Sequence, residues 1–216
     1  MDGFSFARYN QQIYNRNMEL KTRYYFTELP ENYVSDYVIG ASSKKTNRII
    51  GILFPILLIL TFVICEAINR FNFAIEFKLV PTIVSPLVFV LAYFLMVVVH
   101  ELIHGLFNKI LTHEKLVFGF TRSSAYCGTP NIYVKKGAKM VIALAPFVIL
   151  LAALIIPLIF IKDPFYYLLM SIFLGLHVGG CSGDLVEFFI LLFKYHRKDV
   201  LILDTGPTQT IFLKQE

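Results

Sequence analysis

The motif with the clearest chemistry in this sequence is the pentapeptide His100-Glu101-Leu102-Ile103-His104. On a helix, residues four apart lie about 40° apart around the axis and one turn apart along it, so both imidazoles share a face and can bind one metal ion. Glu101 is offset by about 100°, where its carboxylate can take a proton from an activated water without binding the metal. The motif therefore predicts a Zn²⁺ site with His100 and His104 as ligands and Glu101 as catalytic base.

Chance is a poor explanation of this motif. A random arrangement of the same residue types would give it with an expectation of roughly 0.005. The motif also follows the apolar stretch 94–99 directly, and an ionisable side chain at membrane depth costs about 2.5–3.5 kcal/mol. The alternative is a structural role, in which the three polar side chains only hydrogen-bond neighbouring helices.

A catalytic zinc ion usually has three protein ligands and one open position. The last apolar segment of the chain offers His177, Cys181, Asp184 and Glu187. Depth distinguishes them: His100 lies 21 residues into its own apolar segment and Asp184 lies 19 residues into the last one, so at 1.5 Å per residue both lie about 30 Å in. We predict Asp184 as the third metal ligand and Glu187 as the reserve; the alternative for Asp184 is a helix cap or an interhelical hydrogen bond.

His177 lies seven residues before Asp184, on nearly the same helix face and two turns away. It could stabilise a substrate carbonyl or an oxyanion. The alternative is a buried, hydrogen-bonded histidine, and we expect Cys181 to be a core residue.

Glycines recur every four residues in this segment, at positions 175, 179 and 183. Such spacing leaves one helix face almost without side chains and allows another helix backbone to approach, as small residues do between membrane helices. The pattern predicts close packing around Asp184.

The elements that carry these residues are long and apolar. Hydrophobic residues make up 56% of the 216 residues and charged residues only 16%, well below the average of about 25%. Each long apolar segment is near or above the roughly 20 residues that a hydrocarbon core requires. We predict an all-α membrane protein with four transmembrane helices, near residues 49–65, 79–111, 138–161 and 165–193.

The distribution of basic residues predicts the orientation of these helices. Seventeen of the 20 Lys and Arg residues fall on the side of the N-terminus and three on the other side, so both termini are expected in the cytosol of a cell-membrane protein. The basic residues behind the net charge of +5 are therefore expected to set the orientation of the loops, and we expect no nucleic-acid partner. The predicted organisation is a cytosolic N-terminal segment at 1–48, a four-span domain at 49–195 and a cytosolic C-terminal tail at 196–216.

Two short regions have β character. Residues 115–121 and 131–134 are β-prone pieces separated by Ser, Gly and Pro, which predicts a small β-hairpin-like loop on the cytosolic side. Residues 200–206 resemble the Asp-Thr-Gly signature of aspartic proteases, but only ten residues follow and no second lobe is present to supply another aspartate. We predict a short strand that ends in a turn there.

Together these features resemble the intramembrane zinc metalloproteases of the site-2 protease type. The shared features are the HExxH near the cytosolic end of a membrane helix, an aspartate among glycines on a later helix, and a β-prone loop between them. More narrowly, the string His100 to Gly105 and the four-span plan are similar to the bacterial family of putative zincin peptidases, over about residues 25–195. The resemblance implies zinc held by His100, His104 and Asp184, Glu101 as base, and a membrane protein or peptide as substrate. Unlike the site-2 proteases, this chain has Gly183 before its aspartate and no upstream Asn-x-x-Pro motif.

The expected function is therefore a membrane-embedded, zinc-dependent peptidase that has the lipid bilayer and a membrane-associated peptide as its partners. The alternative is a noncatalytic membrane metal-binding or scaffold protein, which gives no reason for Glu101 beside the ligands. A metal transporter is disfavoured because only one ligand cluster is evident, whereas a permeation path needs further polar positions.

Overall fold

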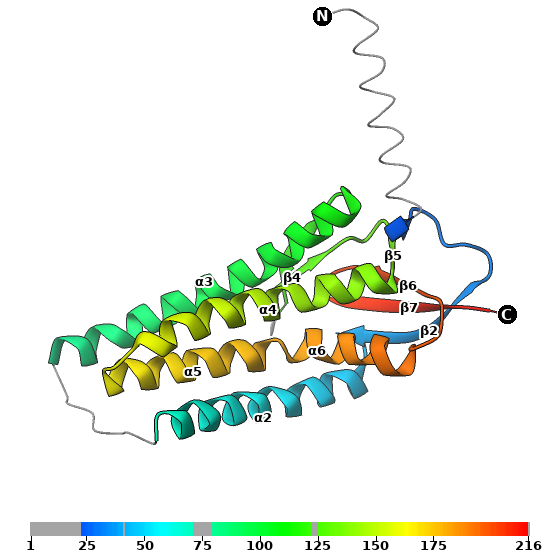
Figure 1. The fold of residues 1–216 in the computed structure, drawn as a ribbon. Helices are drawn as coiled ribbons and strands as arrows, with labels where there is room; N and C mark the ends of the chain where they lie inside the picture. The colour runs from blue at the N-terminus through cyan, green and yellow to red at the C-terminus, as the bar shows by residue number, and fades with distance from the viewer. Residues whose placement is uncertain (1–22, 41, 71–78, 122–124, 216) are drawn as a thin grey trace, which may run out of the picture.

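The computed structural model describes residues 23–40, 42–70, 79–121 and 125–215, and shows long helices with a β-sheet at one end (Figure 1). Among these residues, three helices are long and apolar enough to cross a membrane, and a bent pair would be a fourth span. The helices are α2 (Lys44–Ile68), α3 (Leu79–Thr112), α4 (Lys136–Phe160), α5 (Pro164–Gly180) and α6 (Ser182–Phe189), followed by the π-helical segment η1 (Ile190–Lys194).

The outer face of the helices is apolar. On α3, Leu91, Leu95, Leu102 and Leu106 are each more than half exposed, and they form one continuous stripe because they are spaced at helical intervals. An uncovered apolar surface of this size suits contact with lipid rather than water. This surface agrees with the four apolar segments that the sequence predicts. The predicted external loop between the first two of them includes residues 71–78, which lie outside the described residues.

Helices α2 and α5 pack closely through two of the three predicted glycines. A Cβ atom at Gly175 would lie 2.9 Å from the carbonyl oxygen of Leu58, and one at Gly179 would lie 2.9 Å from that of Phe54. Both positions therefore exclude any larger residue, as the glycine spacing predicts. Gly183 does not continue this contact, because a Cβ atom there would meet nothing within 4 Å.

The fourth predicted span is not one straight helix. It is divided at Cys181 into α5 and α6, which are bent by 41° relative to each other. The N-terminus of α5 is fixed by Asp163, whose side chain accepts a hydrogen bond from the backbone N–H of Phe165 at 2.9 Å, and by Pro164 at the first helical position. The break gives the segment that carries Asp184 a direction of its own.

The all-α class predicted from the sequence is incomplete, because the structure also contains a five-stranded antiparallel sheet. The sheet joins strands from both ends of the described chain in the order β1-β5-β6-β7-β2. Its pairings span up to about 180 residues of sequence, and such distant partners leave no local signal. The strands are β1 (Tyr25–Phe26), β2 (Tyr33–Gly40), β5 (Tyr133–Lys135), β6 (Val200–Asp204) and β7 (Thr208–Lys214).

The predicted hairpin in the loop after α3 is present, with a different second strand. Strand β3 (Val117–Phe120) pairs with β4 (Ala125–Gly128) in a separate two-stranded sheet. The other predicted piece, near residues 131–134, contributes to β5 and pairs with β6 in the larger sheet. The strand predicted near residue 200 is β6, which continues through a turn into β7.

Candidate metal centre

The HExxH motif lies on α3 with both imidazoles facing the interior of the helix bundle. The Nε2 atoms of His100 and His104 are 3.1 Å apart, and the ring centroids are 4.8 Å apart. The four-residue spacing thus brings the two rings together on one face, as the sequence predicts.

Asp184 lies on the first turn of α6, opposite the two histidines. Its Oδ2 atom is 3.1 Å from Nε2 of His100, and its Oδ1 atom is 3.3 Å from Nε2 of His104. The structure therefore brings together the three residues that the sequence analysis selected as ligands, from helix positions that are 84 residues apart for His100 and Asp184. Their donor atoms all lie within 4.8 Å of one another.

The geometry of these donor atoms fits zinc. Tetrahedral bonds of 2.0–2.2 Å place neighbouring donor atoms about 3.3–3.6 Å apart. The separations of 3.1–3.3 Å between the two Nε2 atoms and the carboxylate oxygens are close to this value. Two imidazoles and one carboxylate are also a ligand set that catalytic zinc sites use, with the fourth position left for water.

The orientation of His104 is set by the backbone of α4. Its Nδ1 atom lies 3.0 Å from the carbonyl oxygen of Ile142. A carbonyl oxygen only accepts hydrogen bonds, so Nδ1 carries the hydrogen and Nε2 keeps its lone pair, directed at His100 and Asp184. Metal-binding histidines are usually held in this way by a second hydrogen bond.

A buried group of charges that the sequence analysis did not identify lies beside the site. The ammonium group of Lys139 on α4 donates a hydrogen bond to Oδ2 of Asp204 at the end of β6, and lies 3.6 Å from Oε1 of Glu187 on α6. All three side chains are at most 4% exposed. In the sequence, Lys139 lies at the start of the predicted span 138–161 and Asp204 in the predicted strand and turn at 200–206, and neither pattern predicts an ion pair. Glu187, the predicted reserve ligand, is thus placed against Lys139, whereas Asp184 faces the histidines.

The charges in this region favour a bound cation. The carboxyl groups of Glu101, Asp184, Glu187 and Asp204 form one electrostatically coupled group, and Lys139 is the one buried lysine in the described part of the chain. Unbalanced buried charge is costly. A divalent cation at the His100, His104 and Asp184 group would offset most of this excess negative charge.

A cavity of about 800 Å³ opens onto the site. Glu101 lines it together with His100 and Asp184, as the role of a base acting on bound water requires. Other walls come from α2, α5 and β4, and from the turn between β6 and β7, represented by Phe54, His177, Tyr126 and Pro207.

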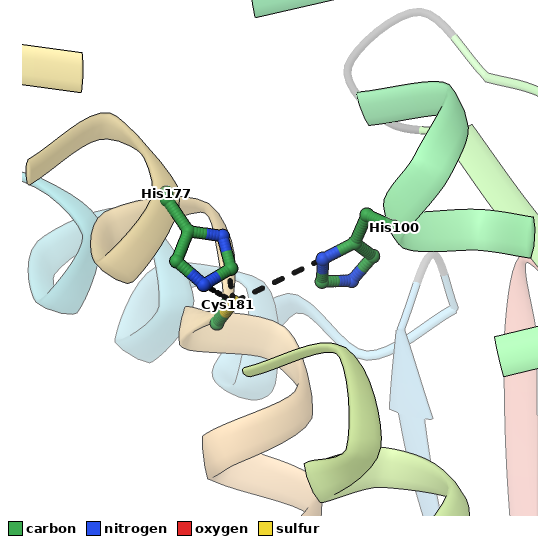
Figure 2. Close-up of side chains that lie close together, drawn as sticks. All are labelled: His100, His177 and Cys181. Carbon is green, nitrogen blue, oxygen red and sulfur yellow. Dashed lines mark hydrogen bonds between the residues drawn. The ribbon is translucent and has the colours of Figure 1, made fainter. Parts of the chain in front are cut away.

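His177 and Cys181 lie on the opposite side of His100 from Asp184 and His104. The Sγ atom of Cys181 is 3.9 Å from Nδ1 of His100, and 3.8 and 3.9 Å from Nδ1 and Nε2 of His177. Figure 2 draws these three side chains together. The Nε2 atom of His177 lies 3.3 Å from the carbonyl oxygen of Phe147. These contacts match the buried, hydrogen-bonded interpretation of His177 more closely than the oxyanion role, which stays a prediction. Cys181 is fully buried, as expected.

The site thus combines two histidines of an HExxH motif with a carboxylate as third candidate ligand, in a chain with helices long and apolar enough to cross a membrane. Residues 93–199 match the model of the family described as putative zincin peptidase, and through this stretch the chain belongs to that family. The matched residues include the two histidines, Glu101 and Asp184, and membership in a zincin family implies zinc. Searches of curated proteins and of solved structures gave no match.

Proposed function

We propose that this protein is a membrane-embedded zinc peptidase that hydrolyses peptide bonds of membrane-associated substrates. The observation that carries the proposal is the carboxylate of Asp184, which contacts the Nε2 atoms of both His100 and His104. A family of zincin peptidases and a glutamate directly after the first histidine agree with this chemistry.

Each side chain at the site has a role in this proposal. His100, His104 and Asp184 would hold the ion, and the Ile142 carbonyl would fix the ring of His104. When bound, zinc lowers the pKa of water toward about 7 and polarises a carbonyl group. Glu101 would accept the proton of the attacking water and deliver it to the leaving amine.

The substrate would enter the cavity of about 800 Å³ in an unwound form, because the peptide bonds of a helix are protected by its own hydrogen bonds. Strand β4 contributes Ala125 and Tyr126 to the cavity wall. We propose that the two-stranded β3–β4 sheet binds the extended substrate by strand addition. An inert interfacial hairpin is the alternative.

The same ligands would also suit a noncatalytic metal-binding or scaffold protein. The position of Glu101 in the cavity wall beside His100 favours the enzyme, because a structural metal site needs no base beside it. We further propose that the lipid bilayer surrounds α2 to α6 and that the sheet and both termini lie in the cytosol.

Metal content of the full-length protein in detergent tests the proposal. One zinc ion per chain is expected, and His100→Ala should abolish it. His113→Ala is the matched control, because His113 lies just beyond the end of α3 and is exposed. A wild-type protein that binds no zinc, or a His100→Ala variant that keeps it, would overturn the proposed site.

A further inference from the structure

A second group of metal-binding side chains lies next to the first and shares His100 with it. His177 at the end of α5, Cys181 at the break before α6, and His100 have donor atoms within 4.8 Å of one another. Figure 2 shows contacts from both imidazoles to the sulfur atom of Cys181 as dashed lines. The peptidase proposal uses neither His177 nor Cys181 as a ligand.

His177 is oriented in the same manner as His104. Its Nε2 atom lies 3.3 Å from the Phe147 carbonyl oxygen, which can only accept, so Nε2 carries the hydrogen and Nδ1 keeps a lone pair. Sγ of Cys181 lies 3.8 Å from Nδ1 and 3.9 Å from Nε2 of the same ring, so a rotation of the imidazole would direct the Nδ1 lone pair at an ion bound to the sulfur. Carbonyl groups of α4 therefore contact one ring nitrogen of each of these two histidines and leave the other nitrogen free to bind a metal ion.

His100 connects the two groups through its two ring nitrogens. Its Nε2 atom faces Asp184 at 3.1 Å, and its Nδ1 atom faces Cys181 at 3.9 Å. A neutral imidazole has one lone pair and one N–H. If Nε2 binds an ion, Nδ1–H points at sulfur; if Nδ1 binds an ion, Nε2–H donates to the carboxylate of Asp184.

We propose that His177, Cys181 and Nδ1 of His100 form a second position for a zinc-class or copper(I) ion, in competition with the HExxH position. Bonds of 2.3 Å to sulfur and about 2.05 Å to nitrogen would place these atoms about 3.5 Å apart in a tetrahedral site. The sulfur-to-nitrogen separations of 3.8 and 3.9 Å exceed this by a few tenths of an ångström, and all three donor atoms lie within 4.8 Å of one another, so binding would draw the three side chains together. Thiolate and imidazole are the ligands that soft and borderline metals select.

Binding at this position releases the thiol proton of Cys181 to water and forms a metal–thiolate bond, without any redox change. The ion has a route, because His100 and His177 both line the cavity. The consequence rests on the proposed function: an ion held at Nδ1 removes His100 from the catalytic ligand set. A softer ion such as copper(I), which prefers thiolate more strongly than zinc does, is therefore expected to inhibit the peptidase in competition with zinc.

Cobalt(II) is the probe that separates the two positions, because only the second one contains sulfur. The test uses the full-length protein in detergent with His104→Ala and Asp184→Asn, which disable the first position but leave an oxygen acceptor for Nε2–H of His100. One equivalent of cobalt should bind and give a thiolate-to-cobalt charge-transfer band in the near ultraviolet. No such band in this variant would overturn the proposal.

Further variants assign the band to its ligands. Adding Cys181→Ser should abolish it, and adding His177→Ala should weaken cobalt binding at least ten-fold, whereas Cys65→Ser, the matched control at another buried helical cysteine, should leave it unchanged. Far-ultraviolet circular dichroism identifies any variant that fails to fold. If the Cys181→Ser variant does not fold, the cobalt affinity of the His177→Ala variant tests the proposal in its place. A band that survives Cys181→Ser would overturn the proposal.

The two proposals fail separately. A missing cobalt–thiolate band would remove the second position and leave zinc binding by His100, His104 and Asp184 intact. Hydrolysis that needs no Glu101 would remove the peptidase chemistry and leave the cobalt result standing.

Discussion

Ile142 and Pro146 are one helical turn apart in α4, and the proline has no N–H to donate to the Ile142 carbonyl oxygen. In an uninterrupted helix that carbonyl would accept from the residue four positions later. Here it accepts instead from Nδ1 of His104 at 3.0 Å. A proline in one helix therefore frees the group that orients a proposed metal ligand on another.

This relationship predicts that Pro146→Ala weakens zinc binding. The substitution introduces a backbone N–H that would compete with His104 for the Ile142 carbonyl, and loss of such outer hydrogen bonds typically lowers metal affinity by about 10–100-fold. Zinc competition with a chelator measures the effect. Pro157→Ala in the same helix is the matched control and should change little; equal affinities for both variants and the wild type would contradict the prediction.

Glu101→Gln separates catalysis from metal binding. Glu101 lines the cavity but belongs to neither group of ligating side chains found among the described residues. The variant should keep its zinc, while peptide hydrolysis should fall by at least the 10²-fold typical of a lost general base. Zinc content and turnover are measured on one preparation. Undiminished turnover would exclude the proposed role of the glutamate.

Asp184→Ala should weaken zinc binding by more than the 10–100-fold expected of an outer-shell change, because it removes a donor group 3.1–3.3 Å from both histidines. Glu187→Gln is the matched control: Glu187 lies one turn further along α6 and contacts Lys139 instead. Equilibrium dialysis against zinc compares the two variants. A larger loss in Glu187→Gln would assign the third ligand to Glu187.

The proximity of Asp184 to the HExxH group could be predicted because it depends on two regular quantities. The helical spacing places His100 and His104 on one face, and the rise per residue gives the depth of His100 and Asp184 in two apolar segments. Neither estimate requires tertiary information. The break at Cys181 did not disturb the depth estimate for Asp184, since the bend comes only three residues before Asp184.

The rest of the site depends on contacts between residues that are distant in the sequence. Lys139 and Asp204 are 65 residues apart and meet only because β6 lies in the middle of a sheet. That sheet in turn requires β2 to pair with β7. Lys139 stands at the edge of a predicted apolar span and Asp204 in a predicted strand and turn, so neither pattern reveals a buried ion pair.

The proposed membrane orientation has its own test. Because seventeen basic residues fall on one side and three on the other, a reporter fused after Glu216 should be cytosolic, and one inserted at Asn72 should be external. Protease protection of both fusions in intact cells provides the measurement. An external C-terminus would reverse the proposed position of the sheet and of the cavity beside it.

The buried pair of Lys139 and Asp204 should be required for stability. Lys139→Met removes the ammonium and leaves the carboxylates of Asp204 and Glu187 buried without a counter-charge, which typically costs about 3–5 kcal/mol. The midpoint temperature of thermal unfolding in detergent should be much lower for this variant than for the wild type. The double variant Lys139→Met with Asp204→Asn should recover part of the loss, because one uncompensated charge is gone. The amide introduced at position 204 can still accept from the backbone N–H of Gly206, which is 2.8 Å from Oδ1 of Asp204.

Lys136→Met is the matched control in the same helix turn. Lys136 donates to the main-chain carbonyls of residues 195, 196 and 198, and has no carboxylate partner among its hydrogen bonds in the described part of the chain. Equal destabilisation by Lys136→Met and Lys139→Met, without recovery in the double variant, would show that the ion pair contributes nothing specific.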